Sequence, residues 1–186
     1  MDMKEMRFET LADYMEAFSK NPDLAVIPTP LVAEHLGRTP PAVTAMIRTG
    51  KLDEIQIGKN KFIALRSLME LEKAFQRQVD IVEQYLRDLV KEGRRSVFYE
   101  PIMTKVGMDP AIPADRTKIG EILGEVSRRS MKRDGVLLSV LVHRKSAGNT
   151  GPGPGFFKLA AELGCSWTDD NAFVEEQTAL VVKKYS

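Results

Sequence analysis

The stretch that decides the fold is residues 27–72, IPTPLVAEHLGRTPPAVTAMIRTGKLDEIQIGKNKFIALRSLMELE. Its first half predicts two short helices, because each begins at a threonine next to proline and ends at a glycine. Thr29-Pro30 precedes a helix over 31–36, and Thr39-Pro40-Pro41 precedes a helix over 42–49. The turn between them is short and contains glycine, as in a helix-turn-helix.

The second half of the stretch predicts a hairpin followed by a long helix. Residues 52–57 alternate in polarity like a strand, Gly58-Lys59-Asn60 forms a turn, and 61–65 return as a second strand. Ser67 is expected to cap a helix that continues to about residue 92, where Gly93 follows. The order helix, turn, helix, hairpin, helix is that of a winged helix-turn-helix.

In this order the pieces resemble the winged-helix family of excisionases and mercury-resistance (MerR-like) regulators. The resemblance covers about 45 of the 186 residues. The matching pieces are Val32-Ala33-Glu34-His35-Leu36-Gly37, Thr39-Pro40-Pro41-Ala42-Val43, Met46-Ile47-Arg48-Thr49-Gly50-Lys51-Leu52, Gly58-Lys59-Asn60-Lys61 and Ser67-Leu68. The sequence departs from the family where the second helix opens with two prolines in place of polar residues, which leaves fewer side chains there to read bases.

The resemblance implies binding to double-stranded DNA, with the second helix in the major groove. Ala42 and Thr44 are expected near thymine methyl groups, and Arg48 near guanine or phosphate. The hairpin tip is expected at phosphate or in the minor groove. The predicted contacts in this half of the chain are Arg38, Thr39, Ala42, Thr44, Arg48, Lys51, Lys59, Asn60 and Lys61. His35 has no partner in the sequence that would suggest catalysis or metal binding, so an ordinary surface or half-buried histidine is expected.

Basic residues are unevenly distributed, although the net charge is only +1. Residues 28–66 hold 6 basic and 3 acidic side chains (+3), and residues 94–158 hold 12 and 6 (+6). The segments 1–27, 67–93 and 159–186 carry −3, −2 and −3. A polyanion could therefore be bound by two separate basic blocks.

The long helix carries an apolar stripe with spacings of 3 and 4 residues: Leu68, Leu71, Phe75, Val79, Val82, Leu86 and Leu89. Two interpretations are open. The stripe could form an antiparallel coiled coil in a homodimer, as the resemblance suggests. Alternatively, it could pack on a second domain of the same chain.

Further elements are predicted on both sides of this region. Residues 5–19 are expected to form one amphipathic helix that ends before Pro22. Residues 94–164 are expected to form a small α/β unit. Its predicted elements are helices over 97–106, 114–132 and 156–163, and a buried strand over 136–142.

This second half contains two basic clusters, Arg128, Arg129, Lys132 and Arg133, and then Arg144 and Lys145. One hypothesis is that they form a second phosphate-binding surface. The competing hypothesis is that they pair with an acidic tail and only hold the domain together. That tail contains Asp169, Asp170, Glu175 and Glu176.

Enzymatic sites are poorly matched. The glycine-rich loop 148–155 lacks the Gly-Lys-Ser/Thr ending of a phosphate loop, and its prolines remove N–H donors. A nuclease could be assembled from Glu121, Glu125 and Asp134 near Lys145, but no Asp-x-Lys or Glu-x-Lys motif lies on the strand. The single cysteine, Cys165, excludes an internal disulfide, and there is no Cys/His spacing for zinc.

The N-terminus does not read as a secretory signal, and no apolar run could span a bilayer, so a cytoplasmic protein without membrane contact is expected. The predicted fold is mainly α with small β elements. It comprises an N-terminal helix plus winged helix-turn-helix over 1–66, a long linking or dimerisation helix over 67–93, and a small α/β domain over 94–186. The first functional hypothesis is a non-enzymatic, cofactor-free transcriptional regulator that binds duplex DNA as a homodimer. The second is an architectural or assembly factor on mobile DNA, and the third is a metal-dependent nuclease.

Overall fold

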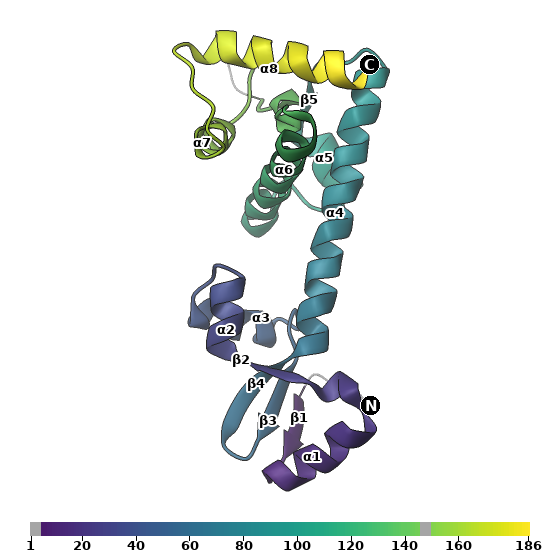
Figure 1. Cartoon of the computed structure of the whole chain (residues 1–186), viewed down its shortest axis with the longest axis vertical. Helices are drawn as coiled ribbons and strands as arrows, with labels where there is room; N and C mark the ends of the chain where they lie inside the picture. The colour runs from purple at the N-terminus through teal and green to yellow at the C-terminus, as the bar shows by residue number, and fades with distance from the viewer. Residues whose placement is uncertain (1–4, 146–149) are drawn as a thin grey trace. The chain divides into compact units, whose positions relative to one another are not determined.

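A computed structural model describes residues 5–145 and 150–186 (Figure 1). The expected mainly α composition is confirmed: about 64% of the described residues are helical, with one small mixed sheet and a second sheet of two strands. The chain divides into two compact units, Met1–Ala74 (unit 1) and Phe75–Ser186 (unit 2). The division falls inside one continuous helix, α4 (Leu65–Lys91).

Unit 1 is built on a four-stranded sheet in the order β1-β3-β4-β2. Strands β3 and β4 form an antiparallel hairpin, β2 lies antiparallel to β4, and β1 lies parallel to β3. In chain order the elements are β1 (Glu5–Phe8), α1 (Leu11–Lys20), the 3-10 turn η1 (Pro22–Leu24), β2 (Val26–Pro28), α2 (Thr29–His35), α3 (Pro40–Arg48), β3 (Glu54–Ile57), β4 (Asn60–Ala64) and the start of α4.

Unit 1 has two small apolar clusters. The first joins α2, α3, β4 and α4 through Val32, Ala33, Val43, Leu52, Ile63 and Leu68. The second joins η1, β3 and β4 through Leu24, Ile55 and Ala64. The two helices that the sequence predicted over 31–49 therefore share one core with the hairpin and with the first turns of α4.

The expected single helix over 5–19 is wrong, because its first part is strand β1. Met6 and Phe8 pack against the second cluster, and the strand pairs with β3 in the register Met6↔Ile55 and Phe8↔Ile57. Helix α1 starts only after Thr10, which caps it in a reciprocal pair with Asp13.

The expected caps also need correction. Thr29 is the first residue of α2 and does not cap it. Thr39 occupies the N-cap position of α3, but its side chain makes no capping hydrogen bond. Ser67 lies inside α4, where its hydroxyl donates to the Ala64 carbonyl and accepts from the Asp53 N–H at 3.0 Å. Ser67 thus ties α4 to the start of the hairpin.

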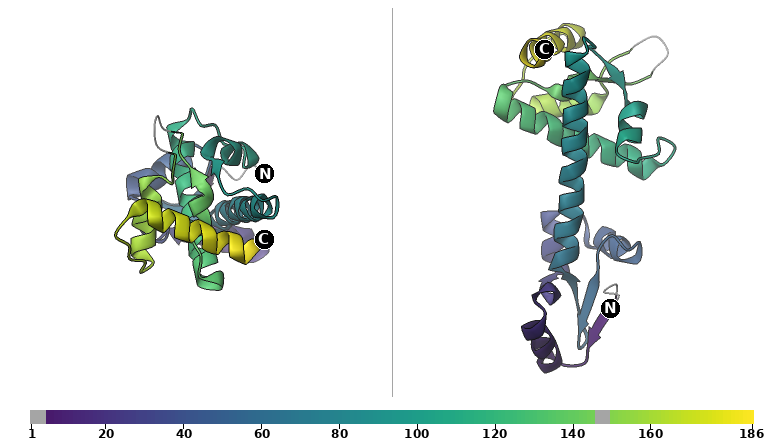
Figure 2. Two further views of the ribbon diagram at one scale, coloured as in Figure 1. Left: turned by 90° about the horizontal axis from the view of Figure 1, so that it is seen from above. Right: turned by 90° about the vertical axis from the view of Figure 1, so that its right-hand side faces the viewer.

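Unit 2 contains the rest of α4 and then short strands and helices: β5 (Val97–Phe98), α5 (Tyr99–Lys105), α6 (Pro113–Asp134), the 3-10 helix η2 (Leu138–Leu141), β6 (Val142–His143), α7 (Pro154–Glu162) and α8 (Asp170–Tyr185). Strands β5 and β6 pair in parallel. Figures 1 and 2 show α8 crossing near the last turns of α4, where the Tyr185 ring lies under the Arg87 guanidinium.

The apolar stripe of α4 packs inside the chain. Val79, Val82, Leu86 and Leu89 are 0–2% exposed and belong to the core of unit 2. Leu68 belongs to the core of unit 1, and Leu71 packs against that core. Phe75 packs against the core of unit 2. Of the two interpretations left open by the sequence, packing on a second domain of the same chain therefore holds from Val79 to Leu89, whereas Leu68 packs in unit 1.

One expectation for unit 2 is wrong and a second needs a shorter helix. Residues 136–142 form mainly the 3-10 helix η2 and only reach β6 at the end, because hydroxyls of α6 take backbone amides that a strand would offer to its neighbour. The Ser130 hydroxyl accepts from the Leu138 N–H, and the Ser127 hydroxyl from the Ser139 N–H. The expected helix over 97–106 begins with the strand β5. The segment that carries the acidic residues, for which no secondary structure was predicted, is mostly helix α8, whose Phe173, Gln177 and Val181 are buried.

Two remaining findings concern the predicted loop and the membrane. Gly148 and Asn149 of the glycine-rich loop lie outside the described residues; further along, Gly153 is the N-cap of α7. Within the described ranges, no helix combines the length and the apolar character needed to cross a lipid bilayer.

Candidate nucleic-acid interface

Helix α3 has one buried face and one exposed face. Val43 is fully buried, and Met46 and Ile47 pack partly against the same cluster. Thr39, Thr44 and Arg48 are exposed, whereas Ala42 is half-buried. The Thr44 hydroxyl donates to the Pro40 carbonyl at 3.1 Å, so the methyl group is the part of this side chain left for outside contacts.

The turn between α2 and α3 brings Arg38 to the surface. Gly37 adopts a left-handed conformation with φ of 59°, which favours glycine because it has no Cβ. The Arg38 N–H then donates back to the Ala33 carbonyl at 2.9 Å and closes the end of α2. The exposed Arg38 side chain therefore lies just ahead of the first residue of α3.

The tip of the β3–β4 hairpin is held by strand β1. The Gly58 N–H donates to the Phe8 carbonyl at 2.8 Å, and the Gln56 side-chain amide donates to the Gly58 carbonyl at 2.7 Å. Lys59, Asn60 and Lys61 are all exposed beyond this anchor. The sequence did not predict the support from β1, because a parallel pairing between residues about fifty positions apart leaves no local signal.

The cations of this region differ in whether they face a carboxylate. Lys61 pairs with Glu54 at 2.8 Å. Arg48, Lys51 and Lys59 are exposed and make no ion pair with any described residue. His35 is a surface residue, as expected, and its Nε2 lies 2.5 Å from Glu72 Oε1 on α4. Three predicted contact residues thus carry uncompensated positive charge.

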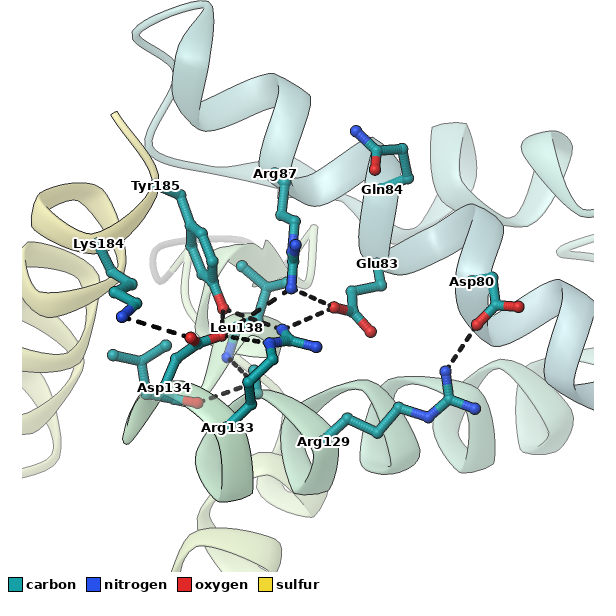
Figure 3. A network of polar contacts seen from close by, with 12 residues as sticks. Asp80, Glu83, Gln84, Arg87, Arg129, Arg133, Asp134, Leu138, Lys184 and Tyr185 are labelled. Carbon is teal, nitrogen blue, oxygen red and sulfur yellow. Dashed lines mark hydrogen bonds and ion pairs between the residues drawn. The ribbon is translucent and has the colours of Figure 1, made fainter.

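The first basic cluster of unit 2, Arg128, Arg129, Lys132 and Arg133, lies on α6 and is here called the α6 arginine cluster. Figure 3 shows the contact of Arg129 with Asp80 and the contacts of Arg133. Arg129 pairs with Asp80 at 2.7 Å and Glu125 at 3.4 Å, and it also contacts Gln76. Arg128 lies 3.8 Å from Glu125. These carboxylates belong to α4 and α6.

Arg133 lies at the centre of a denser network that joins α4, α6 and α8 (Figure 3). It pairs with Glu83 at 2.8 Å and with Asp134 at 2.7 Å. Asp134 also accepts from the Tyr185 hydroxyl at 2.5 Å and pairs with Lys184 at 3.4 Å. Glu83 is only 8% exposed and also forms an ion pair with Arg87 at 2.6 Å.

This network changes the proton affinity of its members. Burial alone would raise the pKa of Asp134, but hydrogen bonds from Tyr185 and Arg133, together with the Arg133 charge, lower it below its ordinary value. Burial alone would lower the pKa of Arg133, but its hydrogen bonds to Tyr185, Asp134 and Glu83 raise it. Both charges are therefore favoured in the folded state.

Three members of the α6 arginine cluster, Arg128, Arg129 and Arg133, are thus paired within the domain, whereas Lys132 forms no ion pair with a described residue. The partners are not the acidic residues named from the sequence. Asp169 instead caps α8, and Asp170 accepts from the Trp167 indole N–H at 2.6 Å.

The second basic cluster of unit 2 is different. Arg144 and Lys145 directly follow β6, are exposed, and form no ion pair with any residue in the described ranges. The Lys145 Nζ lies 5.8 Å from the ring centre of Phe98, which is 39% exposed. The sequence did not single out Phe98, because only the pairing of β5 with β6 brings it near Lys145.

The carboxylates considered for a nuclease are occupied by other contacts. Glu125 pairs with Arg128 and Arg129, and Asp134 belongs to the network around Arg133. Among residues 5–145 and 150–186, no group of three or more His, Cys, Asp or Glu side chains is arranged to hold a metal ion.

The predicted contact residues without a described carboxylate partner are therefore Arg48, Lys51 and Lys59 in unit 1, and Lys132, Arg144 and Lys145 in unit 2. Comparisons of the chain with protein-family models, with curated proteins and with solved structures find no match.

Proposed function

We propose that unit 1 is a winged helix-turn-helix that binds duplex DNA, and that the protein is a non-enzymatic transcriptional regulator. In this proposal α3 is the recognition helix and lies in the major groove. The β3–β4 hairpin is the wing and contacts the backbone beside it.

One observation carries the proposal: Arg48 on α3, Lys51 in the connection after α3 and Lys59 at the hairpin tip are exposed and have no carboxylate partner among the described residues. An unpaired cation on the surface is available to a phosphate or to a base edge, whereas a paired cation must first lose its partner. Val43 and Ile63 supply the buried contacts that hold α3 and the hairpin in the same core.

The individual roles follow from side-chain chemistry. Arg48 offers the fork of donors that matches guanine O6 and N7, or a phosphate. The Thr44 methyl group suits the methyl group of thymine, since its hydroxyl is used within α3. Pro40 and Pro41 have no N–H, so the first turn of α3 has fewer amides to offer to a phosphate. Arg48 and Lys59 are therefore expected to carry most of the affinity.

The test begins with the full chain and a pool of random duplexes, from which a preferred site is selected. Arg48→Ala should then weaken binding to that site by about 1–3 kcal/mol, because one base contact is lost. Binding to a scrambled duplex should weaken less. Both affinities can be measured by fluorescence anisotropy at one fixed salt concentration.

Lys73→Ala is the matched control. Lys73 is exposed on the part of α4 that belongs to unit 1 and forms no ion pair with a described residue, so this variant loses one charge away from α3. Equal losses of affinity for both duplexes would show that Arg48 contacts the DNA backbone and not a base. An Arg48→Ala variant that binds both duplexes like the wild type would remove α3 from the interface and contradict the proposal.

A further inference from the structure

The ends of β5 and β6 bring four side chains of unit 2 together. The parallel register pairs Phe98 with His143, so the next residues, Tyr99 and Arg144, leave the two strands side by side. Val97 and Val142 are buried in the core and fix this position, while Phe98 is exposed on the other side of its strand. Phe98, Tyr99, Arg144 and Lys145 are called the Arg144 cluster below.

The backbone of Arg144 is held by the fold. Its N–H donates to the Gly151 carbonyl at 2.8 Å. A Cβ on Gly153 would lie 2.9 Å from Arg144 Cδ, so the Arg144 side chain would have to shift, and it would lie at an ordinary contact distance of 3.5 Å from the Tyr99 hydroxyl. The stem of Arg144 and the Tyr99 hydroxyl therefore converge on the same small area of backbone.

Three chemical properties meet at this cluster. Arg144 and Lys145 supply two adjacent positive charges that no described carboxylate neutralises, in contrast to the α6 arginine cluster. Phe98 supplies an accessible aromatic face. Tyr99 supplies a hydroxyl: burial raises its pKa more than the Arg144 charge lowers it, so this group remains a donor at neutral pH.

We propose that the Arg144 cluster binds an unpaired strand of DNA, with a base stacked on Phe98 and with Arg144 and Lys145 on the neighbouring phosphates. Cations beside an accessible aromatic ring are the combination by which proteins hold single strands without reading sequence. In a duplex the faces of the bases are covered by their neighbours, so the ring selects an unpaired base. This activity goes beyond the proposed function, because it lies in unit 2 and does not require α3.

The contact between Lys145 and Phe98 is compatible with this exchange. Its length of 5.8 Å is near the outer limit of about 6 Å for a cation–π interaction, so it is weak. A base that stacks on the ring displaces the ammonium group and brings a phosphate that the same ammonium group can bind.

The first experiment uses the full chain and a fluorescently labelled oligothymidylate, with anisotropy measured over a range of salt concentrations. Each phosphate contact on a single strand contributes about 0.7 to the slope of log affinity against log salt. Arg144→Gln with Lys145→Gln should therefore reduce the slope by about 1.4. The control, Lys132→Gln with Lys183→Gln, removes two exposed, unpaired charges of the same unit and should leave the slope unchanged. Equal slopes for the two double variants would overturn the proposal.

The second experiment separates stacking from charge. Phe98→Ala should weaken binding about tenfold without changing the salt slope, since base stacking carries no counterion release. Phe98→Trp preserves an aromatic face and should retain binding, with quenching of the new indole when the strand is added. Circular dichroism on each variant confirms folding. Loss of binding in a folded Phe98→Trp, or no loss in a folded Phe98→Ala, would show that the ring does not stack a base.

The duplex arm keeps the two proposals distinct. A blunt-ended duplex that carries the selected site and has no unpaired loop should respond to Arg48→Ala but little to the Arg144 and Lys145 substitutions, while oligothymidylate should show the reverse. If Arg144→Gln with Lys145→Gln weakens both DNAs equally, the cluster is a general phosphate contact and the single-strand inference fails. If only the duplex response to Arg48→Ala is missing, the proposed function of unit 1 fails and this inference stands.

Discussion

Arg129 and Arg133 reach partners that lie 49 and 50 residues earlier in the chain, at Asp80 and Glu83. The sequence shows these arginines as a dense basic cluster, and the cluster looks like a phosphate site until the fold places α4 beside α6. Arg144 and Lys145 look less conspicuous in the sequence, yet they remain without a carboxylate among the described residues. Composition therefore identifies cations, while only long-range packing determines which of them are available to a ligand.

Asp134 gives a testable pH dependence at this scale. Its pKa is lower in the folded protein than its unfolded value of about 3.9, so its contribution to stability is present above about pH 3.9 and is lost as the pH falls through the folded pKa. Asp134→Asn should lower the free energy of unfolding at pH 7 by about 2 kcal/mol, because charge-assisted hydrogen bonds are lost. It should also flatten the acid limb of the stability curve, measured by urea unfolding between pH 2 and 7.

Glu92→Gln provides the comparison, since Glu92 is exposed and forms no ion pair with a described residue. Its acid limb should match that of the wild type. An Asp134→Asn curve parallel to the wild type over the whole pH range would show that the network around Arg133 does not lower the pKa of Asp134.

At the scale of elements, α4 is the helix whose role the sequence left open. Its stripe is used twice within one chain, by the core of unit 1 near Leu68 and by the core of unit 2 from Val79 to Leu89. The predicted homodimer remains a proposal, and its interface must be sought on a surface other than this stripe.

Neighbouring residues of α4 allow a matched test of this assignment. Val82 is fully buried, whereas Ile81 is 45% exposed. Val82→Glu should unfold unit 2, because it places an unpaired charge in an apolar core. Ile81→Glu should change the free energy of unfolding by less than about 1 kcal/mol. Near-ultraviolet circular dichroism reports tertiary structure, and analytical ultracentrifugation reports the oligomeric state. A Val82→Glu variant that is folded and monomeric would show that the stripe forms a dimer interface.

The elements over 28–66 were predictable because local chemistry and tertiary structure agree there. Proline and glycine mark the ends of α2 and α3, and alternation marks the hairpin. Prediction failed where a distant partner determines the secondary structure. The apolar run over 136–142 is typical of a strand, but hydrogen bonds from its backbone to Ser127 and Ser130 favour η2. Helix α8 did carry a signal, since Phe173, Gln177 and Val181 are spaced by four, but a buried glutamine hides the apolar face.

At the scale of the whole molecule, the chain has separate apolar cores on the two sides of residue 75. A core stabilises the residues that pack around it, so a cavity in one core should act first on its own unit. The continuous backbone of α4 is the element that the two units share.

Hydrogen exchange can test this independence. Ile63→Ala removes a fully buried side chain from unit 1 and should cost about 2–5 kcal/mol there. Peptides from β3, β4 and α3 should exchange faster, while peptides from α6 and α8 should keep the wild-type rate. Ile122 is fully buried in unit 2, so Ile122→Ala should give the opposite pattern, with faster exchange in α6 and α8 and the wild-type rate in β3, β4 and α3. Faster exchange throughout the chain in both variants would mean that the units unfold as one.

Trp167 gives the molecule an optical asymmetry. It is the single tryptophan of the chain, its ring stacks on Phe173 at 4.4 Å, and its N–H is bound by Asp170. Emission excited at a wavelength selective for indole therefore originates in unit 2. A titration with duplex DNA that leaves this emission unchanged gives no information about α3 and the hairpin, so spectroscopy of α3 requires a dye or a second indole placed in unit 1.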